Sequence, residues 1–284
     1  MLLGEILQKT TDFFKEKKIE SARLDAELLI ADVLKLKRIE LYIKFEYPLT
    51  EDEIQRCRDF VRRRAQLEPV AYILEKKDFY NQTFKVKKGV LVPRPETEGI
   101  VEEALSWLKK NNLSELSIVD FGSGSGCIGL SLLKEFSGKG SLLGVDASET
   151  AIEVAKENAV ALELTATEFV KSRVQDFNFE NRNFDVVVAN PPYIATNDRT
   201  IQPSVKTFEP HEALFAEDDG FREISDWAKI AARVLRPGGF VAFEIGSTQA
   251  EKTKKVFAET NQFALIRSVK DLAGLDRFIF AEKS

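Results

Sequence analysis

Histidine and cysteine are scarce in this 284-residue chain, which has one histidine and two cysteines. His211, Cys57 and Cys127 lie far apart in the sequence, so they form no cluster of the nitrogen and sulfur ligands that hold a transition metal. We therefore expect no metal centre. The two cysteines fall in segments that we assign to different domains, so we expect no disulfide and a reducing compartment.

The sequence also lacks a long apolar run. Its first 18 residues, MLLGEILQKTTDFFKEKK, mix acids and lysines with single apolar residues, unlike a secretory signal, and no later segment approaches a membrane span. The chain has 44% hydrophobic residues, 31% charged residues and a net charge of −5, which is typical of a soluble globular protein. We expect a cytoplasmic protein that does not bind a membrane.

The first 71 residues are predicted to form a small helical domain, because their apolar residues recur at three- and four-residue spacing. Thr50 and Glu53 form a capping-box pattern, and Ser21 is a second candidate cap. Residues 1–80 hold 16 basic and 16 acidic side chains. The five arginines between residues 56 and 64 are therefore interpreted as a solvated helix face paired with nearby acids.

Beyond this domain the apolar period changes. The short runs VAYIL, FKV and VLV, separated by polar residues and Gly89, predict a hairpin linker over residues 72–95. In residues 96–284 strand candidates alternate with helical stretches, which predicts an α/β fold with a parallel, doubly wound sheet. The strand candidates are SIVDF (117–121), SLLGVD (141–146), FVKSRVQ (169–175), FDVVVAN (184–190), GGFVAFEIG (238–246) and DRFIFAEK (276–283).

Ligands bind at the carboxyl ends of the strands in such sheets, and a glycine-rich turn follows the first strand. The sequence GSGSG at residues 122–126 can approach a ligand closely, and the helix after it offers free N–H groups. Gly124, Gly126 and Gly129 also fit the dinucleotide fingerprint G-x-G-x-x-G. Asp146 ends the next strand, where its carboxylate could bind the ribose of either NAD or S-adenosylmethionine.

Two further carboxylates bear on this choice. Asp120 stands just before the glycines, where it would repel a pyrophosphate but attract an ammonium or sulfonium group. Asp176 and Phe177 lie near the end of the third strand candidate, where a ring beside a carboxylate could hold an adenine. Asp176 could equally be a turn residue.

The fourth strand candidate ends in NPPY, which places Asn190 in front of Pro191 and Pro192. Residues before proline are kept out of the α region, so this backbone stays extended. An amide nitrogen is a poor nucleophile because its lone pair is delocalised, so an enzyme that alkylates it must hold both of its hydrogens. The Asn190 side-chain oxygen and the Pro191 carbonyl can accept them, while Tyr193 can stack on the planar group. The alternative is a strand edge with an Asx turn.

With these motifs the sequence resembles the HemK family of protein N5-glutamine methyltransferases, which methylate class-I peptide chain release factors. NPPY alone is shared with adenine and guanine amino methyltransferases, whereas PRPETE, FEPHEAL and DLAGLDR are far more specific. The motifs that carry the resemblance are RLDAELL (23–29), EPVAYI (68–73), VPRPETE (92–98), DFGSGSG (120–126), NPPY (190–193), FEPHEAL (208–214), DDGF (218–221), EIGSTQ (244–249) and DLAGLDRFIF (271–280).

The resemblance implies a helical substrate-binding domain over residues 1–71 and a seven-stranded, Rossmann-like methyltransferase domain over residues 96–284. It implies S-adenosylmethionine as the cofactor and a glutamine in an exposed loop of the release factor as the acceptor. The implied cofactor residues are Gly122, Ser123, Gly124, Ser125, Gly126, Asp146, Phe177 and Asn190, and the local arguments for the amino-acid tail and the adenine add Asp120 and Asp176. The implied glutamine pocket is Asn190, Pro191, Pro192 and Tyr193, of which Asn190, Pro191 and Tyr193 are the expected catalytic residues. Glu75 and Asn81 stand in the linker where the family commonly has glycine.

Several other functions share some of these features. Methylation of a nucleic-acid base would need a basic groove, whereas residues 81–284 carry the whole net charge of −5, so we expect no stable nucleic-acid binding. Methylation of a ribosomal-protein glutamine is separated poorly by the motifs. An NAD-dependent oxidoreductase would use the Gly124 to Gly129 frame. A non-catalytic binding module is disfavoured by the intact NPPY.

Overall fold

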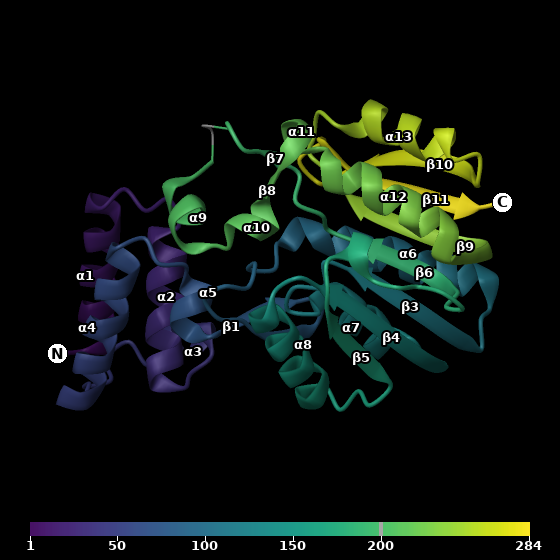
Figure 1. The fold of residues 1–284 in the computed structure, drawn as a ribbon. Helices are drawn as coiled ribbons and strands as arrows, with labels where there is room; N and C mark the ends of the chain where they lie inside the picture. The colour runs from purple at the N-terminus through teal and green to yellow at the C-terminus, as the bar shows by residue number, and fades with distance from the viewer. Residues whose placement is uncertain (199–200) are drawn as a thin grey trace. The chain divides into compact units, whose positions relative to one another are not determined.

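The computed structural model describes residues 1–198 and 201–284, and the chain divides into two compact units (Figure 1). The first unit comprises Met1–Lys76 and Gln202–Phe208, and the second comprises Lys77–Ile201 and Glu209–Ser284. In the described part of the chain, no helix has the length and apolar character needed to cross a membrane. Cys57 and Cys127 are both buried free thiols.

The first unit is built from helices. They are α1 (Leu3–Glu16), α2 (Ala22–Leu34), α3 (Arg38–Ile43), α4 (Glu51–Ala65), α5 (Val70–Leu74) and α9 (Pro203–Phe208). Buried side chains of α1, α2 and α4, among them Leu7, Leu29 and Ile54, form its core. The capping box before α4 is confirmed, since Thr50 Oγ1 accepts from the Glu53 amide at 3.3 Å and Glu53 Oε2 accepts from the Thr50 amide at 2.8 Å. Ser21 precedes α2 but makes no side-chain capping bond.

The arginine run of α4 is paired with acids, as the sequence predicts. Four of the five arginines remain 40% or more exposed, so their ion pairs contribute little to stability and keep the helix face solvated. Arg64 is the buried exception. The pairs are Arg56 with Asp52, Arg58 with Glu51, Arg62 with Asp59, Arg63 with Glu68 and Arg64 with Asp25.

The strand expected at VAYIL is wrong, because residues 70–74 form helix α5. A short apolar run has no clear period, and here Pro69 precedes a helical turn that buries Ala71, Tyr72 and Ile73. A hairpin follows it, but its strands are β1 (Lys76–Phe79) and β2 (Gln82–Lys85). Of the predicted runs, only FKV (84–86) overlaps a strand, and VLV (90–92) forms none. Glu75 and Asn81 both adopt a positive φ, 55° and 60°, which is the conformation that glycine adopts most easily.

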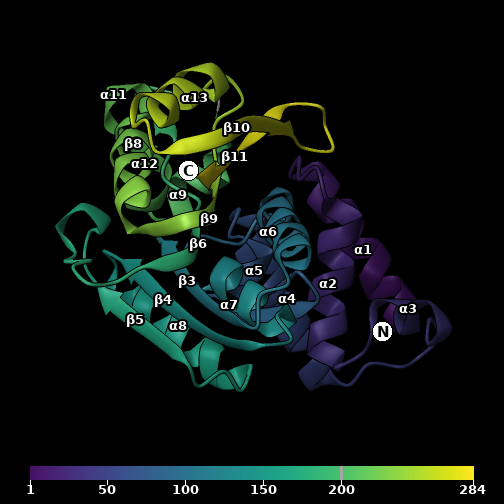
Figure 2. The same cartoon turned by 90° about the vertical axis from the view of Figure 1, so that its right-hand side faces the viewer.

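The second unit contains a seven-stranded sheet with the order β10-β11-β9-β6-β3-β4-β5 (Figure 2). Five neighbouring strands are parallel, and β11 is antiparallel to both β9 and β10. This is the mostly parallel, Rossmann-like sheet that the resemblance implies, so the predicted fold class is confirmed. The strands are β3 (Glu115–Phe121), β4 (Lys139–Asp146), β5 (Thr167–Lys171), β6 (Phe184–Ala189), β9 (Leu235–Glu244), β10 (Phe263–Lys270) and β11 (Asp276–Lys283).

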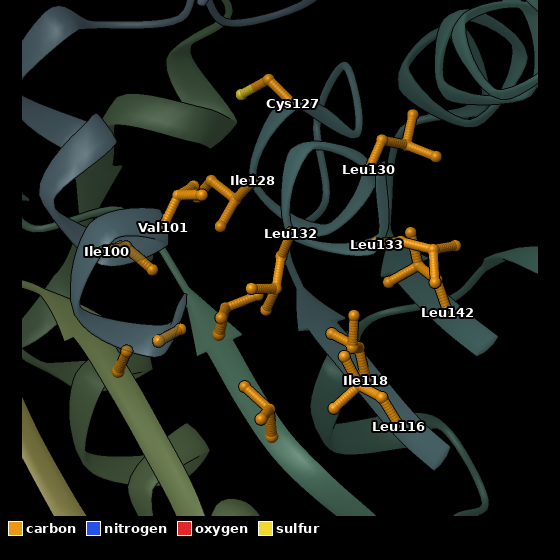
Figure 3. Packing of buried hydrophobic residues seen from close by; sticks show 14 of the residues in the cluster. Ile100, Val101, Leu116, Ile118, Cys127, Ile128, Leu130, Leu132, Leu133 and Leu142 are labelled. Atoms are coloured by element: carbon orange, nitrogen blue, oxygen red, sulfur yellow. The ribbon is translucent and has the colours of Figure 1, made fainter. Parts of the chain in front are cut away.

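Helices cover both faces of this sheet. Residues of α6 (Glu98–Asn111), α7 (Cys127–Glu135) and α8 (Glu149–Ala161) pack on Ile118, Leu142 and their neighbours, and Figure 3 shows part of this cluster. Residues of α12 (Arg222–Val234) and α13 (Ala250–Glu259) pack on the opposite face. All six residues of β6 are buried, which explains its unbroken apolar sequence.

The second unit also contains several short elements, most of which lie near the carboxyl ends of the parallel strands, where the cavity described below opens. They are η1 (Pro95–Thr97), η2 (Val174–Asp176), β7 (Ile194–Ala195), α10 (His211–Leu214), β8 (Phe215–Ala216) and α11 (Glu217–Gly220). Strands β7 and β8 pair with each other in a separate two-stranded sheet.

Candidate active site

The carboxyl ends of β3, β4 and β6 lie at one edge of the sheet, because these strands are parallel neighbours. A cavity of about 540 Å³ opens at this edge, within the second unit. Of the residues predicted from the sequence, it is lined by Gly122, Ser123, Gly124, Ser125, Asp146, Asn190 and Pro192. The structure therefore brings the glycine-rich turn, the carboxylate after β4 and the NPPY segment to one cavity.

The glycine-rich turn needs its glycines for two different reasons. Gly122, Gly124 and Gly126 all have positive φ, between 54° and 79°. A Cβ on Gly122 would lie 2.8 Å from the Trp227 ring, and one on Gly126 would lie 2.7 Å from Leu130, so both positions are sterically closed. A Cβ on Gly124 would come no closer than 4.0 Å to another residue, so Gly124 exposes its backbone to the cavity.

Asp146 ties this turn to the end of β4. Its Oδ2 accepts from the Gly124 amide at 2.8 Å, and its Oδ1 accepts from the Ser148 amide at 2.8 Å. Burial raises the pKa of the Asp146 carboxyl, while the two backbone donors act in the opposite direction. Each oxygen keeps a second lone pair, so the carboxylate can still accept two hydroxyl hydrogens from a ligand in the cavity.

Asp120 lies behind the turn and is not part of the cavity lining. Its Oδ2 accepts from the Gly129 amide at 3.0 Å, whereas its buried Oδ1 meets no donor among the described residues. Burial is the main cause that raises the pKa of this carboxyl to about 7, with the charge of Asp146 adding to the effect. Near neutral pH, Asp120 is thus poised between its neutral and ionised forms.

The raised pKa of Asp120 predicts how stability depends on pH. Between pH 3.8, the ordinary pKa, and about pH 7, the folded state holds a proton that the unfolded state releases, so stability should fall as the pH rises through this window. We expect Asp120→Asn to remove this loss, which by linkage amounts to at most about 4 kcal/mol. Urea unfolding of both proteins at several pH values measures it. The prediction would be contradicted if the free energy of unfolding depended on pH in the same way in both proteins.

Asn190 is held by a chain of buried polar side chains. Its Nδ2 donates to Thr97 Oγ1 at 3.4 Å, and Thr97 Oγ1 donates to Glu244 Oε2 at 2.5 Å. Tyr193 is turned to the same carboxylate, with its hydroxyl donating to Glu244 Oε1 at 3.0 Å. Burial and the charge of Glu244 raise the pKa of the Tyr193 hydroxyl, so it stays protonated. Pro191 is buried, and neither Pro191 nor Tyr193 belongs to the cavity lining.

Asp176 and Phe177 are not brought to the cavity. The residues of this segment that line it are Arg173, Val174 and Gln175. The Phe177 ring packs edge-on against Phe179, with 4.6 Å between ring centroids, and Arg182 lies over it at 5.4 Å.

This placement predicts a small effect of Phe177 on cofactor binding. We expect Phe177→Ala to lower the free energy of unfolding by about 1 to 2 kcal/mol, because the ring is only half-buried against Phe179. The Kd for S-adenosylhomocysteine should stay within about threefold of the unsubstituted protein. Isothermal titration calorimetry measures it, and a loss of more than about tenfold would support the adenine contact expected from the sequence.

Comparisons with known proteins bear on both units. A family described as "PrmC N-terminal domain" matches residues 5–74, and one described as "Methyltransferase domain" matches residues 112–274. The release factor glutamine methyltransferase of Fusobacterium nucleatum is 33% identical over 99% of this chain and 78% of its own length. That of Leptospira interrogans is 42% identical over 96% of both chains. The chain belongs to the release factor glutamine methyltransferase family.

Among solved structures, the chain is similar to a ribosomal protein L11 methylase from Lactobacillus delbrueckii, with 20% identity and a TM-score of 0.48. The match covers 71% of this chain and 84% of that one.

S-adenosylmethionine is the cofactor of this methyltransferase, and the residues of the cavity fit it. Asp146 retains acceptor capacity for ribose hydroxyls, and Gly124 leaves room for a ligand against the backbone. Ser123 Oγ, Ser125 Oγ and Trp227 Nε1 are buried without a hydrogen-bond partner in the described chain, and all three residues line the cavity. Buried polar atoms are normally paired, so this lining is suited to a polar ligand.

Sequence reasoning missed several residues of this methyltransferase site. Arg94 lines the cavity and donates to the buried Glu209 at 2.6 Å, which joins the PRPETE segment to FEPHEAL. Gln249 donates to the carbonyls of Tyr193 and Gly220 at 3.1 and 3.0 Å. A charged or amide residue within an otherwise apolar or turn-forming motif is the sequence signal that could have identified such residues. Glu244, which ends the apolar run of β9, is an example.

Proposed function

We propose that this chain transfers a methyl group from S-adenosylmethionine to the side-chain amide nitrogen of a glutamine in a class-I peptide chain release factor. The observation that carries the proposal is the shared cavity. The Asn190 amide, the only polar side chain of NPPY in the cavity lining, faces the same space as the glycine-rich turn and Asp146. Family membership supports the glutamine of a release factor as the acceptor.

Bound S-adenosylmethionine supplies a methyl group on a cationic sulfur that is already an activated leaving group. The residues proposed to hold it are those of the turn, Gly122 to Gly126, together with Asp146 at the ribose. Asp120, behind the turn, is proposed to attract the positive charge of the amino-acid tail, and Asn190 borders both ligands. Asp176 and Phe177, expected at the adenine from the sequence, lie outside the cavity lining, and the calorimetric test given above decides whether Phe177 contacts the cofactor.

The acceptor half of the site is proposed to orient a poorly nucleophilic amide. Asn190 Oδ1 and the Pro191 carbonyl accept the two amide hydrogens, while Pro192 borders the acceptor in the cavity. Tyr193 is proposed to stack on the planar amide with its ring, since its hydroxyl is engaged by Glu244. Orientation of this kind lowers barriers by roughly 7 to 11 kcal/mol when reactants are held near attack geometry. No general base is assigned, and the amide proton leaves late, to solvent or to the Asn190 oxygen.

The helical segment, residues 1–71, is proposed to bind the release factor, and residues 72–95 to link it to the methyltransferase domain of residues 96–284. We also propose that the protein acts in the cytoplasm, on a glutamine in an exposed loop, without stable binding to nucleic acid or membrane. The net charge of −5 carried by residues 81–284 supports the lack of nucleic-acid binding.

Methyl transfer from labelled S-adenosylmethionine tests the proposal. The acceptors are a purified release factor, the same factor with its loop glutamine replaced, ribosomal proteins, and RNA or DNA. We expect label on the intact release factor alone. Equal label on the factor that lacks the glutamine, or label on ribosomal protein or nucleic acid instead, would overturn it. Titration with NAD, expected to give no binding, removes the oxidoreductase alternative.

A further inference from the structure

Glu244 is a buried carboxylate at the carboxyl end of β9, and its side chain is involved in the site without reaching the cavity. It is 2% exposed, and each of its oxygens receives one hydroxyl hydrogen, Oε2 from Thr97 and Oε1 from Tyr193. An ionised carboxylate only accepts hydrogen bonds, so both hydroxyls must point their hydrogens at it. Burying a charged carboxylate costs free energy unless it is hydrogen-bonded, and the Thr97 and Tyr193 hydroxyls supply these bonds. The presence of a buried carboxylate with two hydroxyl donors beside the site calls for an explanation.

The Thr97 side chain does not form the helix-capping hydrogen bond that is usual at its position. It occupies the N-cap of α6, where a threonine hydroxyl usually accepts from the backbone of the first turn, but no such capping bond is formed. Its hydroxyl lies instead between Glu244, at 2.5 Å, and Asn190 Nδ2, at 3.4 Å. Thr97 is 2% exposed and borders the cavity beside Asn190.

The number of hydrogens on Thr97 decides which way the Asn190 amide points. A hydroxyl has one hydrogen, and here Glu244 takes it. Thr97 therefore presents only lone pairs to Asn190, which must direct its NH₂ group toward Thr97. The two ends of an asparagine amide are opposed, so Oδ1 is left for the cavity that Asn190 lines.

We propose that Glu244 and Thr97 are positioning residues that hold the Asn190 amide with its oxygen toward the methyl acceptor. This inference rests on the proposed function. An oxygen at this point accepts a hydrogen from the NH₂ end of a glutamine amide. A flipped Asn190 would present NH₂ instead, which repels that end and favours the carbonyl end. The pair thus determines that nitrogen, and not oxygen, is the atom presented for methylation.

Opposing effects act on the Glu244 carboxyl, and their net result is a raised pKa, with burial as the largest cause. Arg277 Nη1 lies 3.5 Å from the Tyr193 hydroxyl, and Arg277 Nε donates to Asp271 at 3.2 Å. Burial raises the pKa of Glu244 and the charge of Glu96 adds to this, whereas Thr97, Tyr193 and Arg277 lower it. The charge of Arg277, in the DLAGLDR segment, thereby favours the ionised form of Glu244, which accepts from both hydroxyls.

Three substitutions test the inference. Glu244→Gln is isosteric and introduces an NH₂ that can donate to Thr97, which frees the Thr97 hydrogen to turn to Asn190. Thr97→Val removes the hydroxyl, and Thr97→Ser restores it. We expect the first two to lower kcat for methylation of the release factor by about tenfold or more, with the Kd for S-adenosylhomocysteine within about threefold, and Thr97→Ser to recover most of the activity.

Thr253→Val is the matched control, because Thr253 is also buried but its hydroxyl donates to the carbonyl of Gln249, the residue that precedes α13. It should leave kcat unchanged. Unaltered kcat in both Glu244→Gln and Thr97→Val, or an equal loss of cofactor affinity, would overturn the inference. Failure of Thr97→Ser to recover more activity than Thr97→Val would do the same.

A structural measurement separates this inference from the proposed function. In nuclear magnetic resonance spectra of the unsubstituted protein, the Asn190 side-chain NH₂ should show contacts to the Thr97 side chain, and these should be lost in Glu244→Gln. Their absence in the unsubstituted protein would refute the positioning role even if methylation is observed. Their presence in a protein that methylates no release factor would leave the orientation intact and refute the proposed function alone.

Discussion

Asn190→Ala is expected to lower kcat for methyl transfer to a release factor by about 100- to 1,000-fold, the loss seen when one pre-oriented polar group is removed from an active site. The physical reason is that the side-chain oxygen, fixed by the bond from Nδ2 to Thr97, is lost from the cavity. The Kd for S-adenosylhomocysteine should change by no more than about threefold, because the glycine-rich turn and Asp146 are untouched. Single-turnover kinetics measure the rate of methyl transfer, and calorimetry measures the Kd for S-adenosylhomocysteine.

Asn183 offers a matched control for this substitution. It is an exposed asparagine that immediately precedes β6, whereas Asn190 immediately follows it. Asn183→Ala should therefore leave both kcat and cofactor affinity unchanged. If Asn190→Ala weakened cofactor binding as much as it slowed turnover, Asn190 would be a residue that shapes the cofactor site and not one that orients the acceptor.

Asp146→Asn is expected to raise the Kd for S-adenosylhomocysteine by about 100-fold, a loss of roughly 3 kcal/mol. The carboxylate accepts two backbone amides, one on each oxygen, from Gly124 and Ser148. An asparagine has one acceptor oxygen, so its NH₂ would face one of these N–H groups. The turn would lose a bond, and the ribose would lose an acceptor.

Asp226→Asn removes one negative charge in the same way, from a half-buried position on α12 outside the cavity lining. It should bind S-adenosylhomocysteine as the unsubstituted protein does. Equal affinity in Asp146→Asn and the unsubstituted protein would show that the carboxylate only braces the turn. A loss of thermal stability matching that of cofactor affinity would point to the same conclusion.

The strand ends were predictable from sequence because each is marked by a change in local composition. The apolar run of β6 stops at Asn190, the run of β3 stops at the glycines, and that of β4 stops at Asp146. Parallel strands place their carboxyl ends at one edge, so three local signals sufficed to predict a shared site. The structure brings all three to one cavity.

One expectation was wrong and another finds no support in the cavity lining, in both cases where the local signal was ambiguous. VAYIL is apolar without a clear period, and packing in the helical unit, where Ile73 joins the core, made it helix α5. Asp176 and Phe177 were expected at the end of the strand candidate FVKSRVQ (169–175), but β5 ends at Lys171 and a 3₁₀ turn covers Val174–Asp176. The Phe177 ring contacts Phe179 and Arg182. The turn at Asp176 is the alternative that the sequence left open.

The proposed chemistry was predictable from NPPY, the glycine-rich turn and Asp146, because each of these signals is local in the chain. The orientation of Asn190 was not. It depends on two residues that are distant in the chain. Thr97 lies 93 residues before Asn190, and Glu244 lies 147 residues after Thr97. A threonine at a helix start and a glutamate at a strand end have ordinary local explanations. Only the tertiary structure, by burying both beside one amide, decides where a single hydroxyl hydrogen goes.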